Sequence, residues 1–338
     1  MKRARSRKGA PGIIEVAKRA KVSPATVSRF FNDPDIVRPV TRKKIESAAN
    51  DLGYIRDRMA SAMHHGFSGT IGLIVPTIAN AIFSELIQAF SERLLQHDRT
   101  MLVAAHGYDL NLEVGIVRAL LERRIDGVAL VGFAHDPVPL EMLAVRNVPV
   151  LEIWNYRPQG SLSCVGADNV EAGYEVTRYI LERGHKKILL AFPPTDANDR
   201  AADRLEGAIK AFSADVNFNT EHHLLETRYD IGEAKQRIRS ALESQRFTAI
   251  VCGNDVIAQG AVYACQNMGL KIPDDISIIG IGDFHGSAEM EPGLTTWRLP
   301  ARRIGETAAD ALCNEGFAHQ KHVKITSSIV ERGSVARI

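Results

Sequence analysis

Three short runs of hydrophobic residues at helical spacing begin the chain. Ser23 followed by Pro24 is typical of a helix N-cap with proline at the first helical position. A further helix is predicted from about Thr41 to Leu52, with Gly53 ending it. In the first helix one face can be lined by Ile14, Val16, Ala17 and Ala20, and in the second the helical spacing continues with Ala25, Val27, Ser28 and Phe31. In the third, the residues expected to face inward are Ile45, Ala48, Ala49 and Leu52. The pattern therefore predicts an all-α N-terminal region in which two short helices flank a tight turn.

From Thr70 the pattern changes to short β-rich runs that alternate with amphipathic helices. The strand-like runs are TIGLIV, TMLVAA, GVALVG and VPVLEI, and, after about Leu162, KKILLAF, HHLLE, TAIVCG and SIIGIG. Strands separated by helix-length segments predict parallel sheets covered on both faces. Two such series predict two similar lobes, with a ligand expected beyond the C-terminal ends of the strands.

Charge is divided unevenly between these two regions. The 338-residue chain has a formal net charge of +2, yet residues 1–65 hold 15 Lys and Arg against 6 Asp and Glu. The remaining residues hold 27 bases and 34 acids, so a region of net charge +9 precedes one of −7. This asymmetry indicates an anionic partner for the N-terminal region alone.

Composition excludes several classes of protein. Hydrophobic residues make up 45% of the chain and charged residues 24%, which is typical of folded domains. No apolar run approaches the ~20 residues that span a bilayer, and no apolar segment follows the basic N-terminus, so we expect a cytoplasmic protein. The cysteines lack metal-ligand spacing and are expected to be free thiols. They are Cys164, Cys252, Cys265 and Cys313.

The basic N-terminal region has the features of a helix-turn-helix. In that motif the second helix enters the major groove and presents its N-terminal residues to base edges. Arg29 is the strongest candidate, because a guanidinium pairs with guanine O6 and N7. The other candidates are Ser23, Pro24 and Ala25 for bases, and Thr26, Thr41 and Arg42 for phosphates. The alternative is a basic three-helix module that binds a protein or stabilises a dimer.

Specific motifs resemble those of the lactose/galactose repressor (LacI/GalR) family. EVAKRAKVSPATVSRFFN and VTRKKIESAANDLGY are similar to that family's DNA-binding head, and GTIGLIVP, ERGHKKI, DRLEGAIKAF, CGNDVIAQGA and EPGLTTWRLP follow in the family's order. The resemblance covers roughly residues 13–335. It implies a homodimeric repressor of a pseudo-palindromic operator, with an α/β two-lobed body related to periplasmic binding proteins, and the same DNA-contacting residues as above. An activator or dual regulator responding to a different sugar is the alternative within the family.

The resemblance also implies a domain plan. A disordered basic arm is expected over residues 1–12, a helix-turn-helix domain over 13–55, a hinge linker over 56–69, and an effector-binding and dimerisation domain over 70–338. Lys21 stands where the family usually has glycine, so the turn must adopt a costlier geometry. In the linker, Arg56, Asp57, Ser61 and Met63 replace the family's proline, asparagine, arginine and leucine. Met63 is either an apolar wedge in the minor groove or a dimer-packing residue.

The gluconate-operon repressors are the subgroup that the chain most resembles, through AAHGYD, RRIDGVAL, VPVLEIWN, VGADN and MEPGLTTWRLP. Matching positions within the family implies an effector site formed by Asn80, Phe83, Arg200, Arg204, Tyr229, Asn254 and Asp283. The aromatic residues suit the carbon face of a sugar, and the asparagine and aspartate suit its hydroxyl groups. The expected effector is an anionic polyol such as gluconate, a keto-gluconate, or another aldonate or uronate.

Arg200 and Arg204 are one helical turn apart, so both guanidiniums can converge on one carboxylate. The alternative for Arg200 is an ion pair with Asp196 or Asp203 at the helix surface. Trp154 either lines the pocket floor or fills the interface between the lobes. Gly282 stands where sugar-binding relatives often carry aspartate, which weighs against a neutral sugar.

Other functional classes fit the sequence less well. GIGDFHG has the spacing G-x-G-x-x-x-G, whereas a dinucleotide site needs G-x-G-x-x-G opening a helix. The adjacent histidine pairs at 64–65 and 222–223 lack a third ligand at suitable spacing, so we expect neither a metal nor a cofactor. We therefore expect a regulator, not an enzyme. A transport receptor is disfavoured by the basic head and the missing signal peptide.

Overall fold

The computed structural model describes residues 11–56, 67–213, 224–314 and 321–338. It divides the chain into two compact units, residues 1–68 and 69–338. We call them the head and the body. Within the described residues, no helix is long and apolar enough to cross a membrane. The predicted linker residues Asp57, Ser61 and Met63, and both histidine pairs, lie outside the described ranges.

The head consists of three α-helices, as the hydrophobic pattern predicts. They are α1 (Ile13–Ala20), α2 (Pro24–Asn32) and α3 (Pro39–Leu52), with a 3-10 turn at Pro34–Ile36 before α3. Ser23 is the N-cap of α2, because its Oγ accepts a hydrogen bond from Thr26 N at 3.1 Å, and Gly53 ends α3 in the left-handed conformation. Both terminal signals were therefore read correctly from the sequence.

A small core joins the three helices. It contains Val16, Ala17, Ala20, Val27, Val37, Ile45, Ala48 and Ala49. The prediction that Ile14 faces inward is wrong, since its side chain is 66% exposed. Its neighbour Ile13 packs against the core instead, next to Val16, Ala17 and Ala20, which are buried as predicted.

The body has two sheets, and the first belongs to what we call the N-lobe. Its strand order is β11-β5-β4-β3-β1-β2, and all neighbouring strands are parallel. The strands are β1 (Thr70–Val75), β2 (Thr100–Ala105), β3 (Gly127–Val131), β4 (Val150–Asn155), β5 (Ser163–Ala167) and β11 (His322–Lys324). Helices α5 (Ala81–Gln96) and α12 (Ala301–Cys313) pack on one face, and α6 (Glu113–Glu122) and α7 (Pro137–Val145) on the other.

The second sheet belongs to the C-lobe and has the order β12-β10-β9-β8-β6-β7. Its strands are β6 (Ile188–Phe192), β7 (Leu224–Glu226), β8 (Ala249–Cys252), β9 (Ser277–Gly282), β10 (Thr295–Arg298) and β12 (Ile329–Val330), of which β12 alone is antiparallel to its neighbour. Helices α8 (Asn169–Leu181) and α9 (Asp199–Ser213) cover one face, and α10 (Ile231–Ser244) and α11 (Asp255–Asn267) the other.

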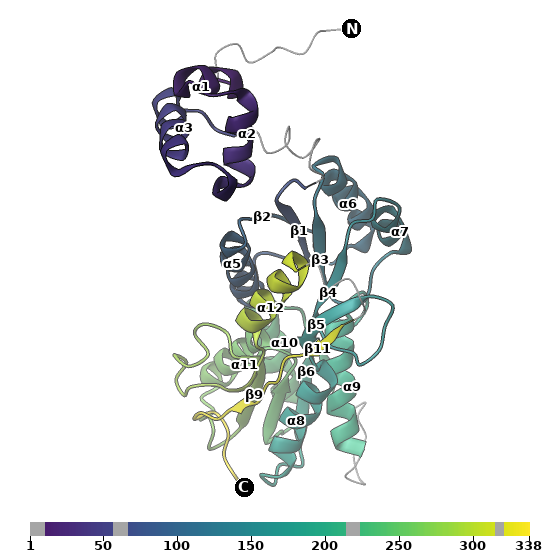
Figure 1. The fold of residues 1–338 in the computed structure, drawn as a ribbon. Coiled ribbons are helices and arrows are strands. Elements are labelled where there is room, and N and C mark those ends of the chain that lie inside the picture. Colours follow the sequence, from purple (N-terminus) through teal and green to yellow (C-terminus); the bar gives the residue numbers. More distant parts are fainter. Residues whose placement is uncertain (1–10, 57–66, 214–223, 315–320) are drawn as a thin grey trace, which may run out of the picture. The chain divides into compact units, whose positions relative to one another are not determined.

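The chain crosses between the lobes more than once. After β10 in the C-lobe, α12 returns to the N-lobe and packs beside α5, as Figure 1 shows for the late-chain helix next to the early one. β11 then joins the N-lobe sheet and β12 the C-lobe sheet. The observed architecture confirms the predicted fold class: a helical helix-turn-helix head and a two-lobed α/β body with parallel sheets.

Candidate DNA-binding surface and effector cavity

Helix α2 presents the predicted base-reading residues on its outer surface. Ser23, Pro24, Ala25 and Arg29 are exposed, while Val27 on the opposite face is fully buried in the head core. Ser23 Oγ is also 2.8 Å from Thr26 Oγ1, so these two hydroxyls are coupled at the start of the helix. The core thus fixes the face that α2 can offer to a groove.

The predicted phosphate-contacting residues differ in how free their side chains are. Arg42 Nε donates to Val37 O at 2.7 Å, and Arg42 Nη1 pairs with Asp35 at 2.9 Å. This guanidinium therefore holds the 3-10 turn to α3. Thr26 and Thr41 are half-buried near the starts of their helices.

Two departures from the family pattern have visible structural consequences. Lys21 ends α1 with φ 58°, which is the left-handed conformation that the usual glycine adopts without cost. Arg56 donates to Phe31 O and to the side chain of Asn32, so it packs against the end of α2. Met63 lies outside the described residues.

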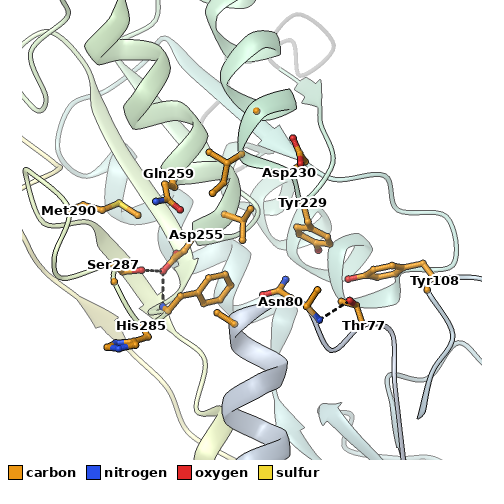
Figure 2. Close-up of a pocket in the computed structure, with 18 residues that line it drawn as sticks. Thr77, Asn80, Tyr108, Tyr229, Asp230, Asp255, Gln259, His285, Ser287 and Met290 are labelled. Carbon is orange, nitrogen blue, oxygen red and sulfur yellow. Dashed lines mark hydrogen bonds between the residues drawn. The ribbon is translucent and has the colours of Figure 1, made fainter. Parts of the chain in front are cut away.

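A cleft in the body contains a cavity of about 670 Å³, which we call the outer cavity. Its walls come from the loop after β1, from the loop after β2, and from the C-lobe segments before α10 and after β9. Tyr108 and Tyr229 lie together on one side, with ring centroids 6.2 Å apart, and Asp255 and Ser287 lie on the other (Figure 2). Asp255 is a structural residue, since its carboxylate accepts from Ser287 Oγ, Thr296 Oγ1 and Phe284 N.

Deeper in the cleft is a second space of about 20 Å³, which we call the inner cavity. Six of the seven predicted effector residues line it, and they come from both lobes: Asn80, Phe83, Arg200, Arg204, Tyr229 and Asn254. The remaining lining residues are Ile82, Tyr108, Trp154, Phe284 and Leu299. Asn80, Tyr108, Tyr229 and Phe284 line both cavities. The outer and inner cavities are therefore adjacent parts of one site.

Asp283 is the predicted effector residue that lines neither cavity. Its carboxylate is held between two arginines, at 2.6 Å from Arg298 Nε and 2.6 Å from Arg332 Nη2. The backbone at Asp283 is also left-handed, with φ 57°. These ion pairs explain why the residue is directed away from the cleft, although it directly follows β9.

Arg204 is a buried cation whose partners are neutral. Its Nε donates to Asn169 Oδ1 at 2.7 Å and its Nη1 to Gly253 O at 3.0 Å, and the side chain is 4% exposed. Among the described residues, no carboxylate forms an ion pair with it. Burial lowers the pKa of Arg204, which is the expected response of a cation removed from water. A buried charge without a counter-ion is costly and favours an anionic ligand.

Arg200 lies one turn earlier on α9 and is also buried. Its Nη1 pairs with Asp199 Oδ1 at 2.8 Å and donates to Val131 O at 3.3 Å. The partner is thus the adjacent Asp199, and neither Asp196 nor Asp203 is in an ion pair with Arg200. Arg200 lines the inner cavity, so the alternative of an ion pair with Asp196 or Asp203 at the helix surface does not hold.

Aromatic rings complete the inner cavity. Phe83 and Trp154 have ring centroids 5.1 Å apart, and Trp154 has the unusual φ of 84° for a bulky residue. Its indole Nε1 is buried without a hydrogen-bond partner among the described residues. Of the two alternatives for Trp154, the structure favours the pocket floor. Tyr108 was missed from the sequence, although it follows a strand end, as the other site residues do.

The described part of the chain contains no cluster of three or more His, Cys, Asp or Glu that could hold a metal ion. Cys164, Cys252, Cys265 and Cys313 are free thiols. The chemistry of the cleft is therefore provided by guanidinium, amide, phenol and indole groups.

A helix-turn-helix head joined to a two-lobed body with a polar cleft defines a DNA-binding transcription regulator with an effector-binding domain. Comparison of the sequence with known families agrees. Residues 12–57 match "Bacterial regulatory proteins, lacI family", and residues 68–332 match "Periplasmic binding proteins and sugar binding domain of LacI family". The chain belongs to the LacI family of transcription regulators, and it is not an enzyme.

Individual relatives extend this assignment. The chain is 31% identical to the HTH-type transcriptional regulator GntR of Escherichia coli K12 over 310 residues, which cover 90% of this chain and 92% of the relative. The solved transcription regulator GntR of Chromobacterium violaceum is 27% identical, with a TM-score of 0.73 over 78% of this chain and 98% of that one. The lac repressor dimer bound to operator and the anti-inducer ONPF is 26% identical, with a TM-score of 0.85 over 96% of this chain and 99% of that one.

Proposed function

We propose that this protein is a homodimeric cytoplasmic repressor whose affinity for a pseudo-palindromic operator is controlled by a sugar acid of the gluconate type. The observation that carries the effector class is Arg204, a buried guanidinium that lines the inner cavity and whose hydrogen-bond partners among the described residues are neutral. Arg200 lines the same cavity one helical turn away. A carboxylate placed between them would supply the charge that Arg204 lacks.

The rest of the site suits the polyol part of such a ligand. Asn254 uses its side-chain oxygen to cap α11 through Ile257 N at 3.0 Å, so it can offer its amide nitrogen to a hydroxyl group. Burial raises the pKa of Tyr108, so its phenol stays neutral and can donate or accept a hydrogen bond. Phe83 and Trp154 provide an apolar face for the carbon chain. Trp154 Nε1 is a further donor for a ligand oxygen.

The small size of the inner cavity has a consequence for binding. About 20 Å³ is roughly the space of one water molecule, so a six-carbon acid needs the lobes to move apart before it can reach both arginines. Such a motion offers a route from effector to DNA, because a ligand shifts an equilibrium only through different affinities for its two states.

On the DNA side, we propose that Arg29 reads a base edge, together with Ser23, Pro24 and Ala25. Thr26, Thr41 and Arg42 would contact phosphates, with Arg42 acting mainly through the turn that it holds. The four base-reading side chains are exposed on α2, which supports this role. Met63 would contact the minor groove or the second subunit from the linker, and Asp283 would support the cleft wall without touching the effector.

The test is calorimetric titration with a panel of sugar acids and their neutral analogues. Gluconate, 2-keto-gluconate and glucuronate are compared with glucose and gluconolactone, on the wild type and on Arg204→Gln. We expect an acid to bind the wild type and to bind Arg204→Gln ~10–100-fold more weakly, because a charge-assisted hydrogen bond contributes ~1.5–3 kcal/mol. Arg239→Gln is the matched control, since Arg239 pairs with Glu243 on the outer face of α10. Preferential binding of a neutral sugar would overturn the proposed effector class.

A further inference from the structure

Among the described residues, Asp199 is the carboxylate that forms an ion pair with one of the two cavity-lining arginines. Its Oδ1 is 2.8 Å from Arg200 Nη1 and accepts from Arg200 N at 2.9 Å. Its Oδ2 accepts from Phe133 N at 2.5 Å and from Asn155 Nδ2 at 3.1 Å. Both oxygens of this carboxylate are therefore engaged, one mainly by the arginine and the other by amide groups.

These contacts join the two lobes. Asp199 and Arg200 form the first turn of α9 in the C-lobe, whereas Phe133 follows β3 and Asn155 ends β4 in the N-lobe. Arg200 adds a second contact between the lobes through Val131 O. The lobes are thus held together at this point by a carboxylate that also neutralises one of the two cavity-lining arginines.

The network continues to the second arginine through amide groups, and Asn155 Nδ2 also donates to Asp203 Oδ2 at 3.3 Å. Asn155 Oδ1 accepts from Asn169 Nδ2 at 3.1 Å, and Asn169 Oδ1 accepts from Arg204 Nε at 2.7 Å. Only neutral amides therefore separate Asp199 from Arg204. Within the ranges that the structure describes, Arg200 therefore forms an ion pair with a carboxylate and Arg204 does not.

We propose that Asp199 is a built-in competitor of the effector, which lowers the affinity of the site for sugar acids. This inference rests on the proposed function. An incoming carboxylate must share or displace the Asp199 contact to Arg200, and it is repelled by the negative charge of Asp199. A neutral polyol carries no charge for Asp199 to repel, so its binding depends little on that charge. The same displacement loosens the contacts that Asp199 makes across the lobes.

The experiment compares Asp199→Asn with Asp196→Asn, which removes the same charge from an exposed position three residues earlier. Asparagine keeps the size of the side chain and can still accept from Phe133 N. By calorimetry, we expect Asp199→Asn to bind the sugar acid about tenfold more tightly than the wild type, with Asp196→Asn near the wild type. Binding of gluconolactone, which carries no charge for Asp199 to repel, should change less than twofold. Asp199→Ser is a second neutral variant, which serves if Asp199→Asn does not fold.

Unchanged or weaker acid binding by a folded Asp199 variant would overturn the proposal and would make Asp199 a residue that positions Arg200. Equal tightening by Asp196→Asn would also overturn it, because the effect would then be one of general charge. These outcomes differ from a failure of the proposed function, in which the wild type itself prefers neutral sugars to every acid tested.

Discussion

At the scale of single residues, two arginines one turn apart have opposite kinds of partner. Arg200 and Arg204, whose spacing in the sequence predicts that they can converge on one carboxylate, both line the inner cavity. That spacing did not predict Asp199 as the partner of Arg200, because ion pairs on a helix are expected three or four residues apart and Asp199 is adjacent. The contact is possible because Arg200 is directed into the cleft, where its neighbour also turns inward to reach the N-lobe.

Asp203 makes the stability of the folded protein depend on pH. Burial, and then the nearby Asp199, raise the pKa of Asp203 to about 6. A raised carboxyl pKa contributes stability that is fully present below the unfolded-state pKa near 4 and is lost as pH rises through about 6. We expect Asp203→Asn to be more stable than the wild type by ~1–3 kcal/mol at pH 7.5, with the difference disappearing near pH 4. Denaturant unfolding between pH 4 and 7.5 measures the difference in free energy of unfolding between the two proteins. A difference that does not change with pH would contradict the raised pKa of Asp203.

Arg29 is the residue on which base reading by α2 depends in this proposal. Arg29→Ala should cost ~1–3 kcal/mol of operator affinity and reduce discrimination at one base pair in each half-site. Thr41→Ala should weaken binding to all sequences by a similar factor, since a phosphate contact carries no base information. Competition binding with single-base operator variants separates the two effects. If Arg29→Ala kept the full sequence preference, another side chain would be the base reader.

At the scale of elements, the hydrophobic runs predicted eight strands, and all eight are present as β1 to β4 and β6 to β9. The runs that were missed are short or polar. β5 has the sequence SCVGA, with small side chains, and β10 has TTWR, with two threonines and an arginine. The crossings of α12 and β11 back to the N-lobe were also missed, because periodicity identifies elements and does not assign them to a sheet.

Helix α9 carries Arg204 and packs closely against α8, and two glycines allow this close packing. A methyl group at Gly173 would collide with Arg204 O, and one at Gly207 would collide with Val170 O. Gly173→Ala should therefore push α9 outward, lower stability by roughly 1–3 kcal/mol and weaken acid binding. Gly115→Ala on α6 is the matched control, since nothing lies within 4 Å of the added carbon and the helix gains stability. Thermal unfolding together with calorimetry measures both effects, and wild-type acid binding by Gly173→Ala would argue against this positioning role.

At the scale of the whole molecule, the region proposed to bind DNA and the region proposed to bind the effector carry net charges of opposite sign. Residues 1–65 carry a net positive charge, and the body, which binds the effector in our proposal, is net negative. A fragment beginning at Thr70 should therefore bind sugar acid without binding operator. The full-length protein should lose operator affinity steeply with salt, with a slope of about −0.9 for each phosphate neutralised. Fluorescence anisotropy with labelled operator tests both statements, and tight operator binding by the fragment would contradict the division of roles.

The central claim is that a carboxylate bound by Arg200 and Arg204 controls operator affinity. The most direct measurement is operator occupancy at increasing sugar-acid concentration, for the wild type and for Arg200→Ala. We predict that an acid shifts the wild-type occupancy and that its half-point moves ~10–100-fold higher in Arg200→Ala, as expected for the loss of one charge-assisted contact. A half-point that Arg200→Ala leaves unchanged for every acid, or a wild-type response only to neutral sugars, would contradict the claim.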